Sequence, residues 1–150
     1  MTGKHVNFDA NYFQRRIIEE FRANGGKVGG MFKDATLALL TTTGARTGAL
    51  RTVPLEYLVV DGKPVVVASA MGAPRNPGWY HNILRNPAVT VEVGTEKYDA
   101  MAAIPDGEEY DGLWAAVVEQ APGFRDYQAR TTRRIPVVLL RLTDEMQVAG

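Results

Sequence analysis

Hydrophobic positions recur along the chain at two different spacings, and the spacing separates helices from strands. Phe13, Ile17 and Phe21 recur every four residues, which predicts an amphipathic N-terminal helix within residues 1–26, ended by Gly25-Gly26. Later apolar runs are short and bounded by turn residues, which is typical of strands. We expect six strands, at residues 36–43, 51–60, 64–69, 89–93, 97–104 and 135–142.

Turn residues join several of these strands into hairpins. Asp61-Gly62 is the strongest hairpin signal, and Gly94-Thr95 predicts a second hairpin. Pro54 lies inside strand 51–60 and has no N–H to donate to a neighbouring strand. It therefore requires an edge, a bulge, or a place where something other than a strand meets the backbone.

Helices are expected between the hairpins. Asn76-Pro77 predicts a short helix with Asn76 as its N-cap, ending near Asn86-Pro87. Asp106 and Glu109 have the spacing of a capping box and open an amphipathic helix, and residues 124–132 have helical bias. Because helices do not alternate one for one with strands, the pattern favours an α+β fold, an antiparallel barrel of about six strands with flanking helices.

Length and composition restrict the possible chemistry. The 150 residues suit one domain, residues 1–150, with a helix in 1–26 and the barrel with its inserted helices in 35–142. The absence of cysteine excludes a disulfide framework and a cysteine nucleophile, and with two histidines we expect no metal site. No Walker loop or nucleophile-elbow motif is present. The difficult chemistry of an enzyme would therefore fall to a bound cofactor.

Charge is distributed unevenly although the net charge is zero. Residues 1–86 hold 11 basic and 6 acidic side chains, whereas residues 87–150 hold 6 basic and 11 acidic ones. A basic half suits nucleic acid, an anionic membrane surface or an anionic cofactor, unless folding mixes the two halves. No apolar run is long enough to span a membrane, and the N-terminus lacks the apolar core of a signal peptide, so we expect a cytoplasmic location.

Two stretches carry the candidate binding residues. Residues 41–51 combine threonine hydroxyls, glycines and the guanidiniums of Arg46 and Arg51, a set that suits a phosphate or carboxylate; an exposed polar hairpin is the alternative. Residues 68–82 place small residues at a strand end before a helix start, where a planar ring and an anion can bind. Trp79 is either an aromatic wall of this site or a core residue.

In this order and at this spacing, the two stretches resemble the deazaflavin-dependent nitroreductase family, small actinobacterial reductases that use coenzyme F420. The resemblance covers residues 7–142, and its most specific mark is Asn-Pro-Gly-Trp-Tyr-His-Asn at 76–82, followed by Asn86-Pro87. It implies a split antiparallel β-barrel, similar to the FMN-binding split barrels, that holds the deazaflavin in a groove. Its other marks are Leu40-Thr41-Thr42-Thr43-Gly44 with Gly48 and Arg51, Pro54-Leu55, Asp61-Gly62, Val67-Ala68-Ser69 and Ile135-Pro136-Val137.

The resemblance implies a role for individual residues. Arg46, Thr47 and Arg51 would bind the phosphate and the start of the acidic oligoglutamate tail of the cofactor, because guanidiniums pair well with such anions. Pro54 and Leu55 would abut the ring system. The other implied cofactor-binding residues are three that act through their backbone and three from the following helix: Ala68, Ser69, Ala70, Trp79, Tyr80 and Asn82.

The activity implied is hydride transfer from reduced coenzyme F420 to an electrophilic small molecule, namely a quinone, an activated enoate or a nitroaromatic. The protein would mainly hold donor and acceptor face to face. Phe124 and Tyr127 would border the substrate, with Tyr127 as the candidate catalytic proton donor. Nitroreduction stays open, because nitro-reducing members present several tyrosines where this chain has Ala121, Phe124 and Tyr127. The alternatives are a non-catalytic F420 carrier or storage protein, and a split-barrel protein that binds FMN or haem.

The N-terminal helix leaves two predictions open. Its apolar face and basic side chains suit peripheral contact with the inner face of a membrane, which would serve a lipid-soluble quinone. Alternatively it packs on its own barrel or on a second subunit of a homodimer, because Asp9, Glu19 and Glu20 interrupt the basic surface. We expect a small-molecule substrate and no nucleic-acid partner.

Overall fold

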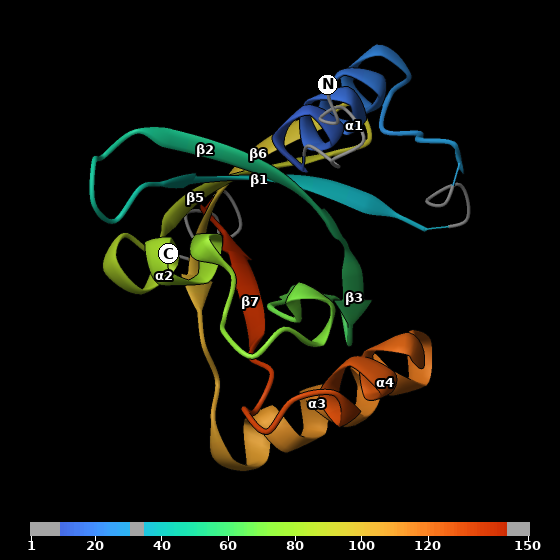
Figure 1. Ribbon diagram of the computed structural model, residues 1–150, viewed down its shortest axis with the longest axis vertical. Coiled ribbons are helices and arrows are strands. Elements are labelled where there is room, and N and C mark those ends of the chain that lie inside the picture. Colours follow the sequence, from blue (N-terminus) through green and yellow to red (C-terminus); the bar gives the residue numbers. More distant parts are fainter. Residues whose placement is uncertain (1–9, 31–34, 144–150) are drawn as a thin grey trace, which may run out of the picture.

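The structure is a computed structural model that describes residues 10–30 and 35–143. The first nine residues of the predicted N-terminal helix lie outside this range. Four α-helices, one 3-10 helix and seven strands form the described part (Figure 1). In chain order these are α1 (Ala10–Ala23), β1 (Leu37–Thr43), β2 (Leu50–Glu56), β3 (Leu58–Val60), β4 (Lys63–Val67), η3 (Ala70–Gly72), α2 (Gly78–Arg85), β5 (Ala88–Val93), β6 (Glu96–Ala103), α3 (Gly107–Gln120), α4 (Gly123–Ala129) and β7 (Val137–Leu142).

The seven strands form one curled sheet in the order β2-β1-β5-β6-β7-β4-β3, and all neighbours are antiparallel. Strands β2 and β3 stand at opposite ends of this order but follow one another in the chain, separated only by Tyr57. One continuous run of chain therefore supplies both ends of the sheet, and the sheet curls round to meet itself (Figure 1). The predicted strand 51–60 is thus two strands, because its first half pairs with β1 and its second half with β4.

Local turn signals place the hairpins correctly. Asp61 and Gly62 have φ angles of 51° and 77°, so both central residues of the β3–β4 turn are left-handed, as a type I′ turn requires. Gly94, with φ of 60°, lies in the turn between β5 and β6. Pro54 of β2 lies opposite Leu39 of β1, and β2 is an end strand of the sheet. Of the three placements that the sequence left open for Pro54, the edge position is therefore the one observed.

One predicted helix cap is wrong, and the other is confirmed in position but makes no capping hydrogen bond. Helix α2 begins at Gly78 with Pro77 as its N-cap, and Asn76 makes no cap. The Asn76 side-chain oxygen instead accepts a hydrogen bond from Arg133. Helix α3 has Asp106 at its N-cap position, but the Asp106 side chain makes no capping hydrogen bond, so the capping box is not formed. At Asn76 a tertiary partner competes for the side chain, so spacing along the chain does not decide its use.

The strands are buried on two faces by different sets of side chains. The interior core of the barrel collects alternate residues of β1, β4, β5, β6 and β7, and α2 contributes Trp79 and Ile83 to it. On the outer face of β4 and β7, helices α3 and α4 pack in a second cluster. Strand β1 shows the alternation most clearly, because Ala38 and Leu40 enter the interior core whereas Leu37 and Leu39 contact α1 outside.

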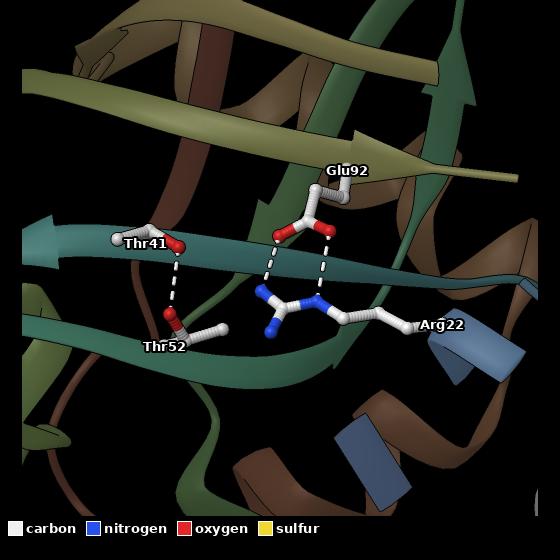
Figure 2. Close-up of polar contacts among 4 residues, drawn as sticks. All are labelled: Arg22, Thr41, Thr52 and Glu92. Carbon is white, nitrogen blue, oxygen red and sulfur yellow. Dashed lines mark hydrogen bonds and ion pairs between the residues drawn. The ribbon is translucent and has the colours of Figure 1, made fainter. Parts of the chain in front are cut away.

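Helix α1 is held on the outside of the sheet by apolar and polar contacts. Ile17 and Phe21 are 7% and 1% exposed and pack with the outer face of β1. Arg22 forms a bidentate ion pair with Glu92 of β5, at 3.1 and 2.7 Å (Figure 2). The hydrogen bond from Arg22 lowers the pKa of Glu92. The apolar face of α1 is therefore buried on its own barrel. Of the two alternatives for this helix, the structure favours packing on the barrel over contact with a membrane. None of the described helices could span a membrane.

Candidate functional site

Asn82 joins the two stretches that the sequence singled out. Its side-chain oxygen accepts a hydrogen bond from the backbone N–H of Ala45 at 2.9 Å, and its Nδ2 donates to the Thr42 hydroxyl at 3.0 Å. Thr42 is 1% exposed and faces α2 on the interior side of β1, where Asn82 begins the second turn of its helix. The β1–β2 turn is therefore fixed to α2. Asn82 serves this turn through both polar atoms, which sequence reasoning did not foresee.

The turn held by Asn82 presents the predicted anion-binding residues. Arg46 lies in the turn itself and Arg51 pairs with Thr42 at the start of β2; both side chains are exposed. Neither guanidinium has a hydrogen-bond or ion-pair partner among residues 10–30 and 35–143. The Thr47 hydroxyl accepts from the Ala49 N–H at 3.2 Å and shapes the turn. The neighbouring hydroxyls of Thr41 and Thr52 bond to each other at 2.7 Å, so they brace β1 against β2 (Figure 2).

The second stretch follows β4 and has an unusual backbone. Ala68 and Ser69 are 0% and 9% exposed. Ala70 and Met71 have φ angles of 46° and 55°, in the left-handed region that non-glycine residues seldom adopt. Residues in such conformations persist only where their surroundings hold them, and they concentrate at functional sites.

Arg133 is the residue that holds this segment, and the sequence analysis did not select it. Its guanidinium donates to the carbonyls of Ala68, Ser69 and Ala73, at 3.2, 2.7 and 2.9 Å, and to the side-chain oxygen of Asn76 at 2.7 Å. Burial lowers its pKa. An arginine in the pair Arg133-Arg134 carries no local signal of this role, since its partners lie 57 to 65 residues earlier in the chain.

Helix α4 brings the predicted substrate residues against the same segment. A Cβ on Gly72 would lie 2.7 Å from the carbonyl oxygen of Tyr127 and 2.9 Å from Cβ of Arg130, so η3 and α4 are in direct contact. The Tyr127 ring is half-buried, edge-on to Phe124 at 5.9 Å and beneath the Arg130 guanidinium at 5.6 Å. Phe124 is 6% exposed and belongs to the α3–α4 cluster, so Tyr127 is the more accessible of the two.

The remaining predicted residues divide between the core and the sheet edge. Trp79 is 7% exposed and packs in the interior core, which is the alternative that the sequence left open for it. Tyr80 is half-buried against the same core, as is Leu55. Strand alternation puts the Pro54 side chain on the opposite face from Leu55, so only one of the two can face a common ligand with its side chain. No cluster of three potential metal ligands occurs in the described part of the chain.

Comparison with known proteins identifies the family of the chain. Residues 13–141 match the model of the F420H2-dependent quinone reductase family. An F420H2-dependent quinone reductase of Mycobacterium tuberculosis is 40% identical over 124 residues, which cover 80% of this chain and 83% of the relative.

Two solved structures are similar in both sequence and fold. One is an F420H2-dependent reductase, 40% identical with a TM-score of 0.64, covering 71% of this chain and 94% of that protein. The other is described as a domain-swapped dimer and is 36% identical with a TM-score of 0.67, covering 89% of this chain and all of that protein. The family model, the 40% identical relative and the similar solved reductase together show that this chain is a member of the F420H2-dependent quinone reductase family, whose cofactor is coenzyme F420.

Proposed function

We propose that this chain reduces a quinone with hydride from coenzyme F420H2. The observation that carries the proposal is the Asn82 bridge, which fixes the basic β1–β2 turn beside α2. Arg133 ties the start of the α2 segment to the strained loop after β4. These contacts bring together the two stretches that resemble the family, and a quinone is the acceptor in the names of the family and of the 40% identical relative.

The side chains at this site fit an anionic cofactor. Arg46 and Arg51 are exposed cations with no acidic partner in the described part of the chain, so their charge is available to a phosphate or carboxylate. Guanidiniums are suited to both anions because they donate in a planar fork. Arg46, Arg51 and the turn that Thr47 shapes would hold the phosphate end, and the backbone of residues 68–70 would line the ring.

When bound, reduced coenzyme F420 supplies the hydride, and a quinone takes up that hydride and one proton to become the hydroquinone. The chain has to hold the acceptor in place and supply or relay the proton. Tyr127 is placed for this role because α4 packs on η3, next to residues 68–70. Its hydroxyl makes no hydrogen bond within the part of the chain that the structure describes, so it can donate to an acceptor oxygen.

The position of α1 favours a reductase over a carrier. A helix that covered the ring would leave no room for a substrate. Helix α1 instead packs on the outer face of β1 through Leu37 and Leu39, whereas Thr42 faces Asn82 on the interior side. The same position of α1 is compatible with nitroaromatic and enoate acceptors. We rank these below quinones because this chain has Ala121 and Phe124 near Tyr127, where nitro-reducing members present several tyrosines.

Anaerobic oxidation of F420H2 by the purified protein tests the proposal. Menadione, an activated enoate and a nitroaromatic are compared as acceptors, and binding of F420 and FMN is titrated in parallel at the same salt concentration. We expect tight binding of F420, exclusion of FMN and fastest turnover with the quinone. Replacement of Tyr127 by phenylalanine should lower kcat by about 100-fold with little change in F420 affinity. F420 binding without turnover of any acceptor would instead show a carrier, and preference for FMN would refute the cofactor assignment.

A further inference from the structure

The guanidinium of Arg133 binds backbone, not a carboxylate. Three of its four hydrogen bonds go to main-chain carbonyls of the segment after β4, and the fourth goes to Asn76, just before α2. No acidic side chain pairs with Arg133 among the described residues. Four of its five N–H donors thus bind acceptors within residues 68–76.

These contacts determine where the neighbouring amide groups point. In a trans peptide the C=O and the following N–H point in opposite directions. Because the carbonyls of Ala68 and Ser69 point at Arg133, the N–H groups of Ser69 and Ala70 point away from it. Neither N–H has an acceptor in the described part of the chain. A carbonyl that accepts from a cation polarises its own peptide, which makes the attached N–H a stronger donor.

The loop cannot keep this shape by its own preferences. Ala70 and Met71 both have positive φ, and Gly72 follows at 83°. Two external contacts hold the segment: Arg133 binds its carbonyls, and α4 packs on Gly72 so closely that a Cβ there would meet the Tyr127 carbonyl at 2.7 Å. The Ser69 carbonyl also accepts from the Gly72 N–H at 2.9 Å, within the loop itself. Among the described residues outside the loop, Arg133 is the one that binds the carbonyls of Ala68 and Ser69.

We infer that Arg133 is a positioning residue that aims the N–H groups of Ser69 and Ala70 at acceptor atoms of the cofactor ring. The inference rests on the proposed function for the identity of the ligand. Arg133 itself lies behind these peptides and does not form an ion pair with the cofactor. Its role differs in this way from that of Arg46 and Arg51, which act through charge.

Arg133→Gln, Arg133→Lys and Arg134→Gln test the inference. Arg134→Gln is the matched control, because this substitution also removes one arginine charge. The guanidinium of Arg134 lies 4.1 Å from the centre of the Tyr110 ring and does not bind the loop. Amide hydrogen exchange of the cofactor-free proteins reports on the loop without any assumption about the ligand. The hydrogen-bonded N–H groups of this segment are those of Ala68, Gly72 and Ala73. In Arg133→Gln we expect their exchange to accelerate at least tenfold, with β1 and β5 unchanged, and no such change in Arg134→Gln.

Fluorescence titration with F420 at two salt concentrations then tests the effect on binding. We expect Arg133→Gln to raise the Kd at least tenfold while leaving its salt dependence unchanged, because the lost contacts are neutral N–H donors. Arg133→Lys should recover only part of the affinity, since one ammonium cannot span four acceptors.

Several results would overturn the inference. Equal acceleration of exchange in the sheet and the loop would make Arg133 a general stabiliser of the fold. Full recovery by lysine would show that charge alone matters, and a reduced salt dependence in Arg133→Gln would show a direct ion pair. A native protein that binds no F420 would refute the proposed function, whereas unchanged exchange in the loop would refute the role of Arg133 whichever ligand binds.

Discussion

Replacing Asn82 by alanine removes both hydrogen bonds that join α2 to the β1–β2 turn. Each such bond contributes about 1 kcal/mol net to the free energy of unfolding. The Thr42 hydroxyl, 1% exposed, then loses its partner in the core, and a buried unsatisfied hydroxyl costs about 1–3 kcal/mol. The loss of the bond to Ala45 adds to this cost. We expect Asn82→Ala to lower the free energy of unfolding by about 2–4 kcal/mol, measured by urea denaturation.

Two companion variants separate the parts of this effect. Thr42→Val in the Asn82→Ala background removes the orphaned hydroxyl and should restore about 1 kcal/mol or more of the lost stability. Asn82→Asp keeps an oxygen for the Ala45 N–H and another to accept from Thr42, so stability should be largely retained. The added negative charge beside the basic turn should nevertheless weaken F420 binding. A double variant no more stable than Asn82→Ala, or an aspartate variant that binds F420 as tightly as the native protein, would refute this reasoning.

Three other regions give predictions that can be checked separately. Because the hydrogen bond from Arg22 lowers the pKa of Glu92, the ion pair stabilises the fold above the unfolded pKa of about 4.3 and loses this effect as the pH falls through the lower folded value. Glu92→Gln should therefore reduce stability by less than about 1 kcal/mol at pH 7 and converge with the native protein in acid, since Arg22 is half-exposed; an unchanged difference at all pH values would contradict this. Gly26→Ala should destabilise the protein by about 1–3 kcal/mol in thermal or urea unfolding, because Gly26 has φ of 94° and its Cβ would lie 2.7 Å from Cα of Gly94; a neutral substitution would show that this turn can shift. Arg51→Ala should weaken F420 binding by about 1.5–3 kcal/mol, a 10- to 150-fold rise in Kd that narrows at high salt, and unchanged affinity in a titration would remove Arg51 from the phosphate site.

The sequence predicted those features whose cause is local. Asp61-Gly62 forms the expected hairpin because both residues tolerate positive φ, and Pro54 lies at an edge because it has no N–H to donate. The family resemblance then selected residues 41–51 and 68–82, and the structure joins these stretches through Asn82. Nothing in the described structure tests the ligand contacts themselves, which stay predictions.

Features that depend on distant partners could not be predicted from the sequence. Asn76 has the sequence of an N-cap, but Arg133 binds its oxygen instead. No periodicity or motif marks Arg133 in the sequence, because its partners lie 57 to 65 residues earlier in the chain. It reaches them only once the chain has folded and β7, which follows Arg133, has entered the sheet. The split of residues 51–60 at Tyr57 has the same origin, since it depends on which strands meet on either side of the barrel.

The place of β7 in the sheet has a consequence for synthesis on the ribosome. Of the strands that the structure describes, β7 is made last, yet it stands between β6 and β4 and pairs Leu139 with Val65. Until it emerges, β3 and β4 have no sheet to join, and Arg133 is not yet available to shape residues 68–76. The nascent chain therefore carries an open half-sheet with apolar faces until β7 has been made. A chain that stops before β7 should be a target for chaperones and proteases, and the ability to bind a ligand should appear in one late step.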